Sequence, residues 1–126
     1  MFRKDKPPED PKQLGPWGER RAERYLHRKG LQILERNFRC RSGEIDLIMV
    51  DRDRTIVFVE VKTRADETYQ ALETAVTYAK KLRMIRAARL FVADHALQDR
   101  PLRFDVVAIS LAQPRQVRHY PNAFVP

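Results

Sequence analysis

Apolar residues recur along this chain with two different periods, and each change of period marks where a helix or a strand is expected. Within residues 17–29, Ala22, Tyr25 and Leu26 lie three and four positions apart, which is the spacing of one helix face. Gly30 follows directly, in the position where a left-handed residue commonly ends a helix. The pattern therefore predicts a first helix over residues 17–29.

Three short apolar runs follow this helix, and polar turn residues separate them. The runs cover approximately residues 31–38, 44–50 and 55–62. The third run is apolar on both faces as far as Glu60, which is typical of a strand in the middle of a sheet. We expect three strands joined by short turns.

The second half of the chain predicts a long helix and two further strands. Apolar residues return at helical spacing over residues 71–92 and should face the core. They are Leu72, Ala75, Val76, Ala79, Leu82 and Ile85. Residues 103–111 have the pattern of a strand, and residues 117–120 that of a short edge strand. This order of elements predicts an α/β fold with a mixed sheet flanked by helices.

The N-terminal residues 1–16 carry four prolines among alternating charges, with too few apolar residues to offset the entropy cost of ordering. We therefore expect a disordered tail there and a single domain over residues 17–126. The lone Cys40 excludes an internal disulfide framework and fits a reducing compartment. The sequence has no secretory signal and no apolar run near the roughly 20 residues that span a bilayer. A cytoplasmic protein with no membrane partner is expected.

Net charge adds a candidate partner. The chain has 25 basic residues against 17 acidic ones, a formal net charge of +8. Such a surplus attracts polyanions over a long range. Nucleic acid leads among them, because each phosphate that a protein neutralises adds affinity through counterion release. The alternative is that the charge serves solubility alone.

Charged side chains interrupt two of the predicted strands where a buried strand should have none. Glu60 and Lys62 end a strand that is otherwise rich in valine, isoleucine and phenylalanine, and Asp46 lies between Ile45 and Leu47. Residues two apart on a strand share a face, with their bases about 6.5–7 Å apart. Glu60 and Lys62 should therefore point the same way at one end of an interior strand.

An antiparallel hairpin would bring Asp46 to the same place. If Asp46 lies opposite Glu60, residues 51–55 form the loop, a common hairpin length. The same register pairs Ile48 with Phe58, Val50 with Ile56 and Glu44 with Lys62. A shift by one residue would send Asp46 and Glu60 to opposite faces, so the register is a testable prediction.

Two carboxylates in this register need a neutralising partner. At about 5 Å they repel by about 3 kcal/mol if the effective dielectric is about 20. A shared proton, the Lys62 ammonium or a divalent cation could each remove this repulsion. Oxygen ligands of this kind suit Mg²⁺ or Mn²⁺, and the Val61 carbonyl could add a further ligand.

Together these groups would form a workable phosphodiesterase site. A metal there would polarise the scissile phosphate and activate a bound water. Lys62 could orient or deprotonate that water, or stabilise charge developing on the phosphate. The alternative is a buried ion pair of Lys62 with Glu44 or Glu60 that fixes the strand register, although such pairs are poor stabilisers.

Four segments of the chain resemble the YraN-type bacterial family. They are Gly18-Glu19-Arg20 with Ala22-Glu23 and Tyr25-Leu26, then residues 43–48, residues 58–64 and residues 103–107. This family is similar to the restriction-endonuclease-like PD-(D/E)xK nucleases, and among them to archaeal Holliday junction resolvases. The resemblance implies a restriction-endonuclease-like mixed central sheet flanked by helices.

The resemblance also implies roles for particular residues. Asp46 and Glu60 correspond to metal ligands, and Lys62 to the catalytic lysine. In resolvase-like relatives a glutamate on the first helix completes the metal site, and Glu19 is the best match. Glu19 shares the face of the apolar stripe on that helix. Glu23, one turn later, is the alternative.

The leading hypothesis is a Mg²⁺- or Mn²⁺-dependent endonuclease-like domain that acts on DNA, including branched or damaged DNA. The candidate phosphate contacts are Arg64, Lys80, Lys81, Arg83 and Arg86, although a run of charges on a helix can also be a solvated face. One alternative is a non-catalytic nucleic-acid-binding module that retains the nuclease fold, and another is a scaffold for an acidic protein. Since cutting two strands needs two sites, a homodimer is one expected assembly.

Overall fold

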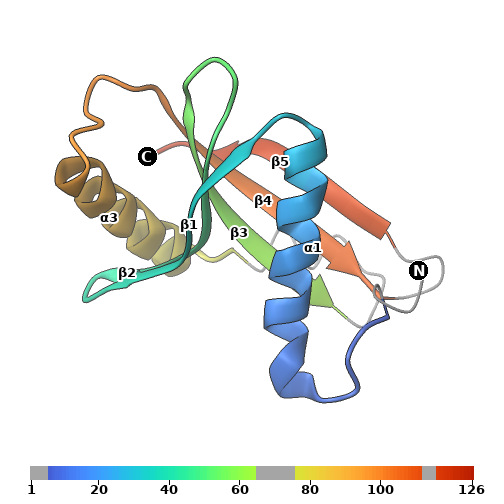
Figure 1. Ribbon diagram of the computed structural model, residues 1–126. Coiled ribbons are helices and arrows are strands. Elements are labelled where there is room, and N and C mark those ends of the chain that lie inside the picture. Colours follow the sequence, from blue (N-terminus) through green and yellow to red (C-terminus); the bar gives the residue numbers. More distant parts are fainter. Residues whose placement is uncertain (1–5, 65–75, 112–115) are drawn as a thin grey trace.

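The structure of the chain, a computed structural model, describes residues 6–64, 76–111 and 116–126 (Figure 1). The elements in these ranges are the 3-10 helix η2 (Pro11–Gln13), α1 (Leu14–Arg28), β1 (Gln32–Cys40), β2 (Gly43–Val50), β3 (Ile56–Arg64), α3 (Tyr78–Asp94), β4 (Leu102–Ser110) and β5 (Gln116–Phe124). The predicted α/β class is thereby confirmed.

One sheet contains all the strands of the described residues, in the order β1-β2-β3-β4-β5. Neighbouring strands are antiparallel except β3 and β4, which are parallel. The chain reaches β4 from β3 by a crossover that includes α3. The sheet is therefore mixed, as predicted, and its arrangement is consistent with a restriction-endonuclease-like fold.

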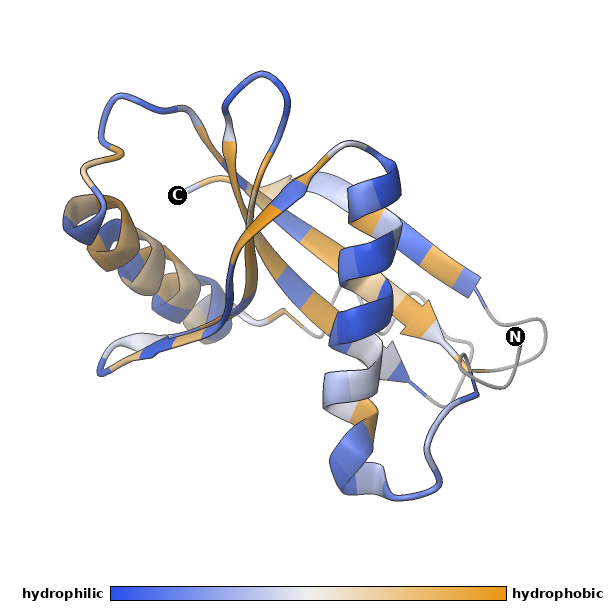
Figure 2. Cartoon of the chain, viewed as in Figure 1, coloured by the Kyte–Doolittle hydropathy of each residue, from blue (hydrophilic) through white to orange (hydrophobic). Residues whose placement is uncertain are grey.

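The helices α1 and α3 cover opposite faces of the sheet. Phe58 of β3 packs in one buried cluster with Phe91 of α3. Its neighbour Val59 packs in a second cluster with Trp17 and Leu26 of α1. Adjacent strand residues point to opposite faces, so α3 and α1 lie on different sides. Figure 2 shows apolar residues along β3 and β4 between them, whereas the visible side of α1 is mostly hydrophilic.

A glycine sets the approach of α1 to the sheet. Gly18 is buried in the first turns of α1, and a Cβ atom built on it would overlap Thr63 Oγ1 of β3. The helix can therefore lie directly against the end of β3. Glu19, the next residue, is carried toward the strand segment that holds Glu60 and Lys62.

The start of each long helix differs from its prediction. The first helix begins at Leu14 rather than at residue 17, so the expected boundary between tail and domain falls inside α1. Pro16 is compatible with this start, because the first turn of a helix does not need its N–H.

The second helix begins at Tyr78 rather than at residue 71. Thr77 Oγ1 accepts a hydrogen bond from the Lys80 N–H at 3.2 Å, which caps the helix there. Val76 is buried as predicted but precedes the helix, and Ala79, predicted to face the core, is exposed. The predicted positions Leu72 and Ala75 lie outside the described residues.

Two smaller points concern the edge strand and the length of the helices. The last strand covers Gln116–Phe124, longer than the predicted edge strand over residues 117–120.

Within the ranges that the structure describes, no helix is long and apolar enough to cross a membrane.

Candidate metal centre between β2 and β3

The predicted hairpin register is confirmed as far as the strands stay paired. Ile48 faces Phe58 and Val50 faces Ile56, and the last pair toward the site is Leu47 with Val59. Asp46 and Glu60 are thus the first residues beyond the paired segment. The predicted pair of Glu44 with Lys62 does not form, because β2 continues beside β1 there while β3 continues beside β4.

Figure 1 shows the resulting separation of the strands. The hairpin of β1 and β2 runs toward α3, whereas β3 continues beside β4 toward the N-terminal part of α1. We call the place where β2 and β3 part, at Asp46 and Glu60, the strand fork. Because of this strand fork, the charged residues lie where the pairing of β2 with β3 ends rather than inside a continuous sheet.

The strand fork has a local cause at Asp46. Its Oδ2 accepts the Val61 N–H at 2.8 Å, so a side chain takes the place of a backbone carbonyl of β2. On the other side of β2, Asn37 of β1 has a left-handed φ of 52°. Ile45 and Leu47 belong to different buried clusters, although residues two apart normally share a strand face. The strand β2 therefore turns sharply at Asp46.

Glu60 is the most enclosed carboxylate of the site, with only 2% of its surface exposed. Its Oε2 lies 3.0 Å from Lys62 Nζ and 3.6 Å from Lys80 Nζ, which comes from the first turn of α3. Its Oε1 is buried and has no hydrogen-bond partner among the described residues. A buried carboxylate oxygen without a partner is costly, and it is the kind of group that a cation would satisfy.

Asp46 is held next to this carboxylate in an uncharged state. Burial is the largest influence, and together with the negative charge of Glu60 it raises the pKa of Asp46 to about 8, against the opposing hydrogen bond from Val61. The protonated form of Asp46 is therefore favoured near neutral pH. Both neutralising partners other than a metal are present: a proton on Asp46 and the Lys62 ammonium on Glu60.

Of the two candidate glutamates on α1, Glu19 faces the site. Burial raises the pKa of Glu19, a hydrogen bond from the Asn37 side chain lowers it, and the charge of Glu60 raises it further. Glu23 is instead occupied by Arg36, whose Nε and terminal nitrogen each donate to it at 2.7 Å. Among the described residues, however, no three carboxylate, histidine or cysteine side chains converge closely enough to hold one ion.

This donor set still fits a hard divalent cation. Mg²⁺ is commonly bound through one or two carboxylates and completes its shell with water and substrate phosphate. Asp46 and the Glu60 Oε1 oxygen supply two such groups, and Val61 follows Glu60 on β3 and donates its N–H to Asp46. The arrangement can therefore take a cation without a third carboxylate in contact, at the expense of the proton on Asp46.

The structure divides the predicted phosphate contacts. Lys80 and Arg83 lie beside the site and line one pocket with the turn of the β1–β2 hairpin. The Lys81 ammonium instead lies over the Phe124 ring, 5.5 Å from its centroid. Arg64 and Arg86 are exposed, at the end of β3 and on α3.

Two residues at the site were missed in the sequence. Lys80 was assigned to phosphate alone, although its ammonium also contacts Glu60. Asn37, which holds Glu19, was not singled out at all. An asparagine within a strand is uncommon, and its tolerance of the left-handed conformation was the available signal.

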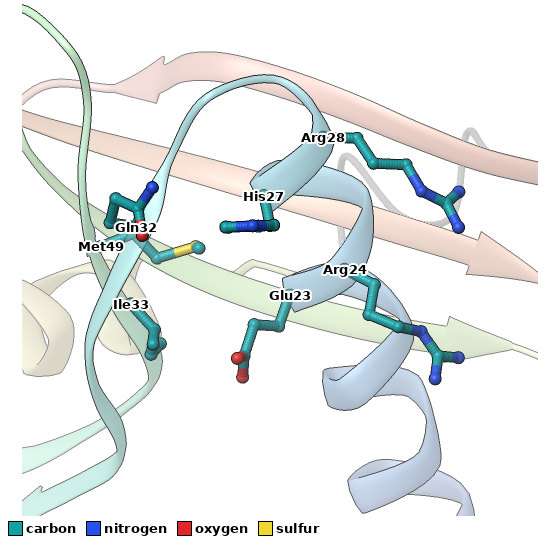
Figure 3. A pocket seen from close by; sticks show the side chains of 7 residues that line it. All are labelled: Glu23, Arg24, His27, Arg28, Gln32, Ile33 and Met49. Carbon is teal, nitrogen blue, oxygen red and sulfur yellow. The ribbon is translucent and has the colours of Figure 1, made fainter.

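A pocket of about 410 Å³ between α1 and β1 lies on the other side of Glu23. Figure 3 shows His27 and Glu23 on its helical wall, Gln32, Ile33 and Met49 opposite, and the Arg24 and Arg28 side chains extending away from β1. Its wall includes none of the residues at the strand fork. It is a separate hollow rather than part of the candidate metal centre.

A second buried carboxylate, Asp105, is fully paired and serves the fold. Arg103 donates to its two oxygens at 2.9 and 3.0 Å, His119 Nε2 lies at 2.7 Å and the Asn122 N–H donates at 2.9 Å. Burial opposes its charge, but the bonds from His119 and Arg103 outweigh burial and hold the pKa of Asp105 below its usual value. Both oxygens of Asp105 thus accept hydrogen bonds, whereas Glu60 Oε1 accepts none from the described residues.

Comparison with known proteins identifies the family. The model of the Uncharacterised protein family UPF0102 matches residues 18–109, a range that includes every residue of the strand fork and Glu19. A UPF0102 protein of Geobacter metallireducens is 47% identical over 114 residues, covering 90% of this chain and 93% of its own length. A second, of Trichlorobacter lovleyi, is 41% identical over 113 residues, covering 88% and 89%. The chain therefore belongs to the UPF0102 family, the YraN-type family that its motifs resemble.

Proposed function

We propose that this chain is a metal-dependent endonuclease-like domain that hydrolyses phosphodiester bonds of DNA at the strand fork. One observation carries the proposal: the buried Glu60 carboxylate lies against the Asp46 carboxyl and the Lys62 ammonium, and no N–H group of the described residues bonds its Oε1. A cation would satisfy this oxygen, since the Lys62 and Lys80 ammonium groups lie beside Oε2 instead. The net charge of +8 and the resolvase-like resemblance support DNA as the substrate.

In this proposal Asp46, Glu60 and the Val61 carbonyl hold Mg²⁺ or Mn²⁺, with Glu19 completing the set. A metal bound there supplies charge stabilisation at the scissile phosphate and a bound water of lowered pKa. Binding requires that Asp46 give up its proton, which the metal's positive charge favours.

Lys62 has a defined place in this reaction. Its Nζ lies 3.0 Å from Glu60 Oε2 and its side chain is largely buried, so the ammonium is held at the site rather than in solvent. From there it orients the attacking water or offsets the negative charge that develops on the phosphate. Lys80, 3.6 Å from the same oxygen, places a second positive charge beside Glu60.

The test is metal binding followed by cleavage. Calorimetric titration with Mn²⁺ should show binding to the wild type that is lost in Asp46→Asn and Glu60→Gln and kept in Asp94→Asn. Asp94 is an exposed carboxylate at the far end of α3, so its variant is the matched control. The titration is repeated with DNA present, because weak Mg²⁺ sites can need substrate phosphate. Metal-dependent cleavage of branched DNA by Asp46→Asn at the wild-type rate would refute the proposal.

One observation favours a second candidate, a nucleic-acid-binding module that keeps the nuclease fold without its chemistry. The negative charge at the strand fork is already offset without a metal, because two lysines lie beside Glu60 and the raised pKa of Asp46 favours its uncharged form. This candidate predicts salt-sensitive DNA binding with no cleavage and no metal affinity. The two titrations above separate it from the enzyme.

A further inference from the structure

A basic pocket lies beside the strand fork, between the turn of the β1–β2 hairpin and the first turns of α3. Its volume is about 310 Å³. The residues around it are Arg39, Cys40, Arg41, Ser42, Gly43, Glu44, Lys80 and Arg83. We call it the hairpin pocket. It shares Lys80 with the candidate metal centre, so the two sites are neighbours.

Positive charge dominates the hairpin pocket, with four cationic side chains against the single carboxylate of Glu44. Glu44 lies 3.4 Å from Arg39 Nε and 3.9 Å from Lys80 Nζ, so it is used by these two. Arg41 and Arg83 have no carboxylate partner among the residues that the structure describes. Two guanidinium groups are therefore left to attract an anion.

The two sides of the hairpin pocket are held together by close packing. A Cβ atom on Gly43 would lie 2.6 Å from the carbonyl oxygen of Arg83, so the hairpin rests directly against the backbone of α3. Within the turn, Cys40 Sγ donates to the Gly43 carbonyl at 3.5 Å. Arg41 and Arg83 thus come from two elements whose backbones touch, which limits how far their guanidinium groups can separate.

We propose that the hairpin pocket is a phosphate-binding subsite for the DNA strand that occupies the strand fork, with Arg39, Arg41 and Arg83 holding a backbone phosphate next to the scissile one. This inference rests on the proposed function for its ligand, but it concerns different residues. The guanidinium fork matches the geometry of phosphate oxygens. Lys80 connects the two sites, because its ammonium lies within 4 Å of carboxylates belonging to each.

The first experiment compares two double variants that remove the same charge. Arg41→Gln with Arg83→Gln alters the hairpin pocket. Arg54→Gln with Arg89→Gln removes two exposed arginines elsewhere, one in the β2–β3 loop and one farther along α3. Affinity for a short single-stranded oligodeoxynucleotide is measured by fluorescence anisotropy over a range of salt concentrations. Long-range attraction falls equally in both, so any difference between them reports local contacts.

We expect the pocket variant to bind about tenfold more weakly than the control variant at moderate salt. Its slope of log affinity against log salt should be smaller in magnitude by about 0.7, which corresponds to the loss of one phosphate contact. Equal affinity and equal slope in the two variants would overturn the inference and leave the proposed function standing. No DNA binding by the wild type would overturn both.

The lone cysteine of the chain gives a second, independent measurement. Cys40 lines the hairpin pocket and is half-buried, so alkylation by N-ethylmaleimide reports on access to it. Saturation with the oligonucleotide should slow alkylation several-fold in the wild type. An unchanged rate at saturation would show that DNA binds elsewhere and would overturn the inference.

Discussion

Replacing Asp46 by asparagine tests whether ionisation of Asp46, next to Glu60 at the strand fork, lowers the free energy of unfolding. The asparagine carbonyl can still accept the Val61 N–H, which Asp46 Oδ2 accepts at 2.8 Å in the wild type. The substitution therefore removes an ionisable group while keeping size and hydrogen bonding. Any change in the free energy of unfolding can then be assigned to ionisation.

The direction follows from the pKa of Asp46, which rises from 3.8 to about 8 in the folded chain. Between these values unfolding releases a proton, so the stability of the wild type falls as pH rises and levels off above about pH 8. The asparagine variant lacks this loss. Its advantage should be close to zero near pH 4 and should grow steadily up to pH 8.

The size of the effect follows from the same two values. Their separation corresponds to an upper bound of about 6 kcal/mol. Because Asp46 is only partly buried, water can reach the ionised carboxylate, and we expect Asp46→Asn to be more stable by about 2–3 kcal/mol at pH 8.5.

Urea denaturation from pH 4.5 to 9 measures this difference, with Asp94→Asn as the control that should follow the wild type. Titrating groups away from the strand fork are common to both proteins and cancel in the difference, whereas Glu60 titrates together with Asp46 and belongs to the measured effect. A pH-independent difference, or a variant less stable than the wild type at pH 8.5, would contradict the reasoning. Mn²⁺ at a hundred times its dissociation constant should return about 2.7 kcal/mol to the wild type alone.

Three further substitutions test the packing around the site. Gly18→Ala should lower the free energy of unfolding by about 1–3 kcal/mol, because the added Cβ would overlap Thr63. Adding Thr63→Ala to this variant should restore most of the lost free energy in urea denaturation. No recovery would contradict the close contact between Gly18 and Thr63. Asp105→Asn leaves Arg103 without its buried carboxylate and should lower the free energy of unfolding by about 3–5 kcal/mol, measured by thermal unfolding. A loss below about 1 kcal/mol would disprove the role of Asp105 in stabilising the fold. Asn37→Ala should cost about 1 kcal/mol and Asn37→Gly less, because φ is 52° there, so equal losses by circular dichroism melts would argue against backbone strain.

The strand register could be predicted because it depends on local chemistry. The charges at Asp46 and Glu60 interrupt apolar strands, which suggests that these two residues face each other. In a hairpin this one pair fixes all the others, so the pairing of Ile48 with Phe58 could be predicted from the residue numbers. The end of the pairing was not predicted. It depends on the side chain of Asp46 competing for the Val61 N–H, which no periodicity records.

Features that join distant parts of the chain were also beyond the sequence. Lys80 reaches Glu60 only because the crossover between β3 and β4 returns α3 to the same edge of the site. The start of α3 was missed for a different reason, since the apolar period continues through Val76 while the cap at Thr77 decides where the helix begins. Local capping outweighed the period there.

The hydrogen bond from the Val61 N–H to Asp46 gives the protein a natural reporter. Most amides of a central strand are bonded to backbone carbonyls and respond to the fold as a whole, whereas this one is bonded to an ionisable side chain at 2.8 Å. Its chemical shift and its rate of hydrogen exchange should therefore follow the charge of Asp46 and the arrival of a cation. A single peak in a ¹H–¹⁵N spectrum of the ¹⁵N-labelled wild-type chain can therefore report the state of the strand fork without an attached probe or a mutation.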